Sequence, residues 1–155
     1  IWLAVIDFAH QVLLARLQTA AQSHVQPLTA LRAVFMAHVD FVVEQPGVPR
    51  VIFQELQHPE DTALKARVRV LMQDYRSLVT RLLLQAQAAG QLAPGTDLQA
   101  SAVLFIGSVQ GLVMQSLLSG QVGAIRTLAP AVFDLFQHAV AAPTNPTRRP
   151  PETTE

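Results

Sequence analysis

The sequence contains no cysteine, so disulfide bonds and thiolate metal sites are excluded. It also has few charges, because Asp, Glu, Lys and Arg make up 14% of the 155 residues and the formal net charge is zero. A neutral chain of this kind offers no long-range attraction to a phosphate backbone or to an anionic membrane. Composition therefore argues against nucleic acid and membranes as partners of this chain.

Hydrophobic residues, by contrast, make up 50% of the sequence, which is enough for one domain with a core of its own. The chain begins IWLAVIDFAH, with no initiator Met, no basic stretch and no small-residue cleavage site. We therefore expect a chain cut from a longer protein, without a signal peptide. Residues 143–155 are rich in Pro and Thr, so we expect a domain over residues 1–142 followed by a disordered tail.

Glycine and proline divide the domain into segments of helical length. Pro27 suits the first turn of a helix that Gly47 stops, and Asp61 is a candidate N-cap for a long helix that ends at Gly90. Apolar residues recur at three- and four-residue steps in these segments, and no strand pattern of comparable length occurs. We predict an all-α fold of six helices, over about residues 2–20, 27–42, 51–57, 61–90, 98–118 and 128–140.

The long helix carries a row of cations beside its apolar arc. Lys65, Arg69 and Arg76 fall on one flank of the arc, and Arg67 and Arg81 fall on the other. Three cations in one row can bind phosphate, but a solvated helix face is the favoured interpretation.

The stretch from Leu98 to Ile125 contains no charged residue and includes Gly107-x-x-x-Gly111, a pattern that also occurs in membrane-spanning helices. Its many Ser and Gln side chains argue against a span, since lipid would desolvate them. This helix and the one after it are each apolar on two sides, whereas the core of a small domain usually buries only one side of a helix.

A homodimer would bury the second side, with two helices from each subunit forming an intermolecular four-helix bundle in which Gly107 and Gly111 allow close approach. The alternative is that both helices are central core helices of a monomer. The predicted interface residues are Val103, Gly107, Gly111, Met114, Leu117, Leu118, Leu128, Val132, Phe133, Leu135, Phe136 and Val140.

Residues 90–111 read GQLAPGTDLQASAVLFIGSVQG. The residues of this stretch that carry a family resemblance are Gly90, Leu92, Asp97, Ala102, Gly107 and Gly111. This stretch resembles the junction of the seventh and eighth helices in TetR-family transcriptional regulators. Residues 45–51 are similar to that family's short sixth helix, and IWLAVIDFAH looks like its fourth. The order, lengths and breaks of the helices match over about residues 1–142.

The resemblance implies the C-terminal ligand-binding and dimerisation domain of a bacterial, cytoplasmic repressor, without the helix-turn-helix that reads an operator. In this family a small-molecule effector enters a cavity between the helices and controls DNA binding allosterically. The corresponding candidates here suit an apolar or aromatic ligand, although ordinary core packing is the favoured interpretation for any single aromatic residue. They are Phe8, Phe35, His38, Val39, Phe53, Gln54, Leu71, Tyr75, Leu78, Phe105, Val109 and Gln110.

Catalytic and metal-binding patterns are weak. Glu55-x-x-His58 has a metal-ligand spacing but no second copy, and nothing resembles a nucleophile elbow or a phosphate-binding glycine loop. We expect neither an enzyme nor a cofactor or metal site. The alternative to a regulatory domain is a helical protein-interaction or lipid-binding bundle with no regulatory output.

Overall fold

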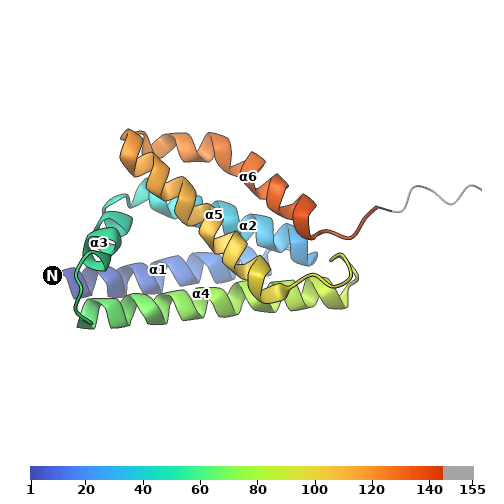
Figure 1. The fold of residues 1–155 in the computed structure, drawn as a ribbon, viewed down its shortest axis with the longest axis horizontal. Coiled ribbons are helices and arrows are strands. Elements are labelled where there is room, and N and C mark those ends of the chain that lie inside the picture. The colour runs from blue at the N-terminus through green and yellow to red at the C-terminus, as the bar shows by residue number, and fades with distance from the viewer. Residues whose placement is uncertain (145–155) are drawn as a thin grey trace, which may run out of the picture.

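The computed structural model describes residues 1–144 and contains six α-helices (Figure 1). Within those residues the only β-type pairing is an isolated bridge between Leu92 and Ala141. The all-α prediction is therefore confirmed. The predicted tail over residues 143–155 falls mostly outside the described residues. The helices are α1 (Trp2–Gln22), α2 (Pro27–Glu44), α3 (Gly47–Leu56), α4 (Ala63–Ala88), α5 (Leu98–Ser119) and α6 (Ile125–Val140), with a 3₁₀ turn at Val122–Ala124.

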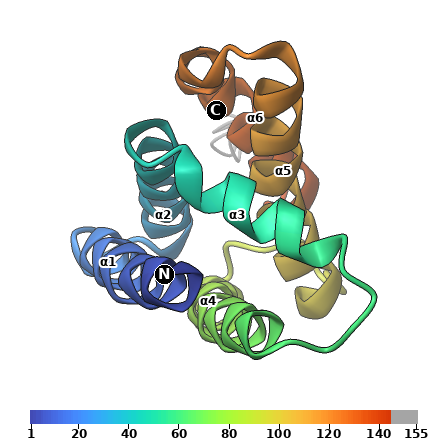
Figure 2. The ribbon, with the colours of Figure 1, turned by 90° about the vertical axis from the view of Figure 1, so that its left-hand side faces the viewer.

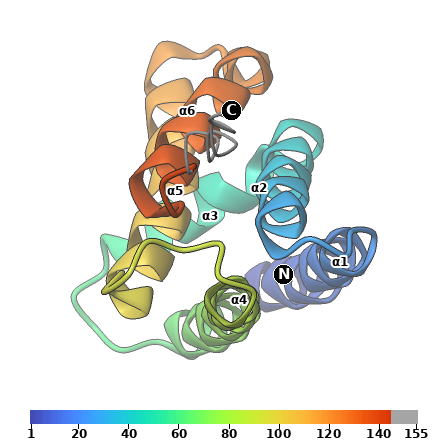
Figure 3. The same ribbon diagram turned by 90° about the vertical axis from the view of Figure 1, so that its right-hand side faces the viewer.

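Helix α2 is the centre of the fold and contacts α1, α4, α5 and α6. Helices α1 and α4 lie side by side on one side of α2, and α5 and α6 lie on the other (Figure 1). The short helix α3 runs across one end of this arrangement (Figure 2). At the opposite end, the loop between α4 and α5 is tied to the end of α6 (Figure 3). There the Ala93 amide donates to the Val140 carbonyl at 2.9 Å, and the Ala142 amide donates to the Gln91 carbonyl at 2.8 Å.

The helix ends confirm some sequence signals and correct others. Asp97 caps α5 as predicted, because its carboxylate accepts a hydrogen bond from the Ala100 amide at 2.9 Å. The predicted Asp61 cap is wrong, since Thr62 caps α4 by accepting from the Lys65 amide at 3.1 Å. Gly47 does not stop α2 but begins α3, four residues earlier than predicted, because Pro49 in the first turn gives up no helical hydrogen bond.

Four phenylalanines form the centre of the core. Phe35 lies edge-on to Phe105 and to Phe133, with ring centroids 5.4 Å and 5.5 Å apart, and Phe136 packs against Phe105 at 5.4 Å. Phe133, Phe136 and Val140 are 0%, 2% and 3% exposed within this one chain. Their prediction as dimer-interface residues is therefore wrong, because they have no surface left for a partner.

Helix α5 is, within residues 1–144, the one helix long and apolar enough to cross a membrane by length and composition. This is weak evidence for a span, since the core helix of a soluble protein passes the same test. In this chain 44% of its most apolar window is buried inside the fold.

Candidate ligand-binding site and dimer surface

A cavity of about 80 Å³ lies where α3 crosses the end of the other helices. Each of the five helices α1 to α5 contributes to its wall, and most of the wall is aliphatic or aromatic. The lining residues are Leu13, His38, Phe41, Val42, Val48, Pro49, Ile52, Phe53, Leu71, Met72, Tyr75, Gln110 and Val113. Such a wall binds apolar groups by removing their surface from water.

His38 and Tyr75 supply the polar contact of this wall. The Nδ1 atom of His38 lies 2.9 Å from the Tyr75 hydroxyl, which joins α2 to α4. Tyr75 is fully buried, whereas His38 keeps some exposed surface, which faces the cavity. The pair leaves the second ring nitrogen of His38 free to hydrogen-bond a bound molecule.

Both members of the pair are neutral at physiological pH. Burial away from water lowers the pKa of His38 from 6.5 to about 4, and burial raises the pKa of Tyr75 above its ordinary value. No other cavity-lining residue titrates. The interior therefore accepts uncharged groups and cannot neutralise a charge.

The cavity borders a groove of about 400 Å³ between α3, α4 and α5, and the two spaces share Ile52, Phe53, Met72 and Gln110 in their walls. We refer to the place where they meet as the mouth of the cavity. Gln110 is exposed and stands where the two spaces meet. The enclosed space alone is smaller than the roughly 300–1,000 Å³ of typical ligand pockets, so a larger ligand must extend into the groove.

Helices α5 and α6 also carry an exposed apolar face. Leu118 is 81% exposed and Leu135 is 72% exposed, and Val103, Leu104, Met114 and Leu128 are each exposed as well. A Cβ atom built on Gly107 or Gly111 meets nothing within 4 Å, so the fold of the chain itself does not require glycine at either position. We refer to Val103, Leu104, Gly107, Gly111, Met114, Leu117, Leu118, Leu128, Val132 and Leu135 as the α5–α6 face.

Residues 52–132, which run from α3 into α6 and include half of the cavity wall, match the family described as tetracyclin repressor-like, C-terminal domain. The chain belongs to this family. The resemblance seen at residues 90–111 is thereby confirmed. No curated protein matches the sequence.

Several solved structures, transcriptional regulators among them, share the fold of this domain. SmeT, the repressor of the Stenotrophomonas maltophilia multidrug efflux pump SmeDEF, superposes with a TM-score of 0.72 at 18% identity, covering 90% of this chain and 80% of SmeT. FadR from Bacillus subtilis, solved in complex with stearoyl-CoA, gives a TM-score of 0.74 at 15% identity. The match covers 85% of this chain and 72% of FadR. A protein of unknown function from Rhodococcus sp. RHA1 gives a TM-score of 0.72 at 20% identity. The match covers 89% of this chain and 72% of the Rhodococcus protein. At identities this low, the structural similarity establishes a common fold but does not identify the ligand of this chain.

The TetR-type fold brings five of the predicted ligand-binding residues together around the cavity, namely His38, Phe53, Leu71, Tyr75 and Gln110. It keeps five others away from the cavity, because Phe35, Val39, Leu78, Phe105 and Val109 are buried in the core between the helices. Phe8 and Gln54 are exposed and line a different, open groove between α1 and α3.

Within α3, Phe53 was the one cavity-lining residue predicted from the sequence, and Val48, Pro49 and Ile52 were missed. Val48 and Pro49 lie in the first turn of α3, before the predicted start of this helix at residue 51. Leu13, Phe41, Val42, Met72 and Val113 line the cavity as well, and none of these five was among the predicted ligand-binding residues. Glu55 is hydrogen-bonded to Thr62, and no group of three metal-binding side chains occurs within residues 1–144.

The His38 pKa predicts that this TetR-family domain loses stability in mild acid. The folded-state pKa of about 4 lies below the unfolded value of 6.5, so the unfolded chain binds a proton first as the pH falls. Lowering the pH from 7 to 5 should therefore reduce the free energy of unfolding by about 2 kcal/mol through this residue. Urea denaturation at both pH values measures the loss.

His38→Gln is the matched variant for this measurement, since Gln can hydrogen-bond Tyr75 but does not titrate. The variant should lose less stability than the natural chain between the two pH values. An identical loss in both proteins would show that His38 keeps an ordinary pKa and is not shielded from water.

Proposed function

We propose that this chain is the ligand-sensing, homodimerising domain of a TetR-like transcriptional repressor that acts in the bacterial cytoplasm and has no enzymatic activity. The observation that carries the proposal is the enclosed apolar cavity, whose wall holds one neutral hydrogen-bonded pair, His38 and Tyr75. An effector with an apolar or aromatic body fits this chemistry. SmeT has been solved with triclosan and FadR with stearoyl-CoA, and these ligands support the same class of effector here.

The homodimer part of the proposal rests on the α5–α6 face. A contiguous apolar face on a small chain usually marks an interaction site, and homodimers bury such faces by two-fold symmetry. Two copies of α5 and α6 would form a four-helix bundle, with Gly107 and Gly111 letting the backbones approach. Charged residues are absent from the face, so apolar burial would supply the attraction.

Helix α5 connects the two parts of the proposed function. Gln110 and Val113 of α5 line the cavity, while Gly107 and Met114, each one turn from Gln110 along the same helix, belong to the α5–α6 face. A ligand that enlarges the cavity must press on α5, and α5 would then shift in the dimer bundle. The effector would thus favour one of two arrangements of the subunits, and operator affinity of the DNA-binding region would follow.

Blocking the cavity tests the ligand-binding part of the proposal. Ile52 is half-buried and lines both the cavity and the groove, so Ile52→Trp should fill the entrance. We expect the affinity for 1-octanol, a neutral apolar probe, to fall at least tenfold in this variant, which is about 1.4 kcal/mol of lost binding. Titration calorimetry measures the affinity.

Val51→Trp is the control, because Val51 is equally half-buried on α3 but lines the groove beside α1 instead. It should bind 1-octanol as the natural chain does. Equal affinities in all three proteins would place octanol binding outside the cavity and contradict the proposal.

A further inference from the structure

The groove outside the cavity mouth is lined by cations and by no carboxylate. Lys65, Arg69 and Arg76 point into it from α4, where their spacing puts them on one side of the helix. The other lining residues are Ile52, Phe53, Leu56, Val68, Met72, Gln73 and Gln110. The groove beside the cavity thus carries more positive than negative charge, although the chain as a whole is neutral.

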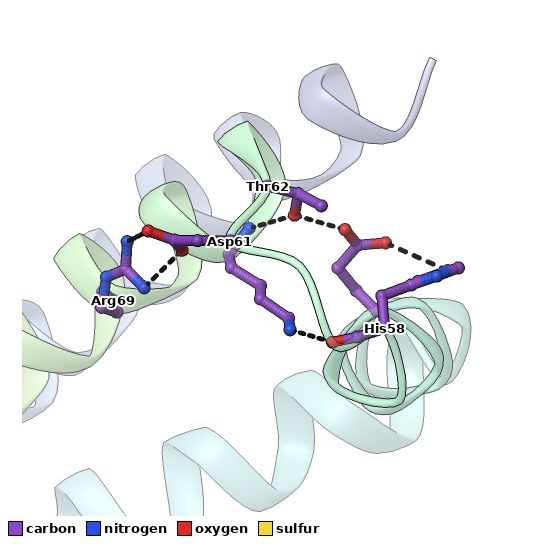
Figure 4. A network of polar contacts seen from close by, with 6 residues as sticks. His58, Asp61, Thr62 and Arg69 are labelled. Atoms are coloured by element: carbon purple, nitrogen blue, oxygen red, sulfur yellow. Dashed lines mark hydrogen bonds and ion pairs between the residues drawn. The ribbon is translucent and has the colours of Figure 1, made fainter.

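Two of the three cations are held by protein groups (Figure 4). Arg69 makes a two-pronged contact with the Asp61 carboxylate at 2.8 Å and 3.1 Å, and Lys65 donates to the His58 carbonyl. These contacts tie the first turns of α4 to the loop that joins it to α3. Both side chains therefore already have protein partners beside the mouth.

Arg76 is different, because within residues 1–144 its guanidinium makes no ion pair and no hydrogen bond. It lies two turns further along α4 than Arg69, on the same side. It also lines the groove one turn beyond Met72, which belongs to the cavity wall. The guanidinium offers two parallel donors that match a carboxylate or phosphate.

The interior and the mouth therefore favour different parts of one molecule. The neutral His38–Tyr75 pair cannot balance a charge, and the enclosed space of about 80 Å³ holds only part of a drug-sized ligand. The remainder must lie in the groove, where Arg69 is already paired with Asp61 and the positive charges of Lys65 and Arg76 would repel a positive group and attract a negative one. A ligand with an apolar body and an anionic end satisfies both places.

We propose that the effector of this domain is an amphipathic organic anion, with its apolar body in the cavity and its carboxylate or phosphate group bound by Arg76 at the mouth. This inference rests on the proposed ligand-sensing function and names the chemical class of its ligand. Lys65 adds positive potential, while Arg76 makes the direct contact.

Probes with one alkyl chain and different end groups test the proposal. At low salt and neutral pH we expect octanoate to bind the full chain about tenfold more tightly than 1-octanol, and octylammonium to bind most weakly. Raising the salt to about 0.5 M should reduce the difference in affinity between octanoate and 1-octanol, because the contact with Arg76 is near solvent and is screened by salt. Octyl phosphate identifies the end group, since its rank above or below octanoate shows whether the mouth prefers phosphate or carboxylate.

Arg76→Gln should reduce octanoate affinity to the level of 1-octanol and leave 1-octanol affinity unchanged, which also shows that the variant is folded. Arg81→Gln is the matched control, because Arg81 is an exposed cation of the same helix that does not line the mouth. Equal binding of octanoate and 1-octanol to the natural chain would overturn the anionic class and leave the proposed function standing. Failure of every probe to bind would overturn both.

Discussion

Replacing Phe133 with alanine should lower the free energy of unfolding by about 3–5 kcal/mol, the usual cost of emptying a buried phenylalanine site. The ring of Phe133 is fully buried and contacts Phe35, Phe105 and Phe136, with centroids 5.5 Å, 6.3 Å and 5.7 Å away. The guanidinium of Arg32 lies 5.4 Å from the same centroid, and this cation–π contact would be lost as well. Urea denaturation followed by circular dichroism measures the change.

Leu84→Ala provides the comparison for Phe133→Ala, because Leu84 is a large apolar residue of α4 that is half exposed and outside the α5–α6 face. It should change the free energy of unfolding by no more than about 0.5 kcal/mol. A Phe133→Ala chain with natural stability but weakened self-association would contradict the structure. It would show that Phe133 belongs to the dimer interface and not to the core of the single chain.

Phe133 also shows what the sequence can predict about α6 and what it cannot. The periodicity of the helix places Phe133, Phe136 and Val140 on one arc and Leu128, Val132 and Leu135 on the next. Both arcs are apolar, and nothing in the spacing says which of them faces the chain's own core. The four-phenylalanine cluster decides this, and its members come from three different helices.

Ser101 is a second case in which tertiary structure overrides the sequence pattern. Its place among Ser and Gln residues of α5 indicates an exposed polar strip, yet it is only 5% exposed. The Ser101 hydroxyl donates to the Asp97 carbonyl at 2.7 Å, one turn earlier in the chain. A serine that satisfies its hydroxyl in this local way can be buried at little cost.

The cavity was predictable where its residues are polar or aromatic and lie on regular helices. His38 and Tyr75 stand in the middle of α2 and α4, so helical spacing turned both toward the same interior. The prediction failed where it depended on helix packing, because Phe35 and Phe105 contact each other and leave no room for a ligand between them. The prediction also missed the first turn of α3, because Pro46 precedes this helix and Pro49 lies within that turn.

The α5–α6 face leads to the second large effect, which concerns self-association. Gly107→Leu should leave the fold of a single chain intact, because a side chain at this position meets open space. In a two-fold dimer it introduces two leucines where the α5 backbones approach, and overpacking costs about 1–3 kcal/mol for each. The dimer dissociation constant should therefore rise by roughly 30-fold to 10,000-fold.

Sedimentation velocity at micromolar concentration distinguishes the two species. The natural chain should sediment as a dimer and Gly107→Leu as a folded monomer, with circular dichroism confirming its helix content. Gln85→Leu adds the same side chain to an exposed site of α4, remote from the face, and should remain dimeric. Because Gly107 is not needed inside the chain, its effect can only come from a second copy. A monomeric natural chain, or a Gly107→Leu dimer of unchanged affinity, would show that the α5–α6 face is not the dimer interface.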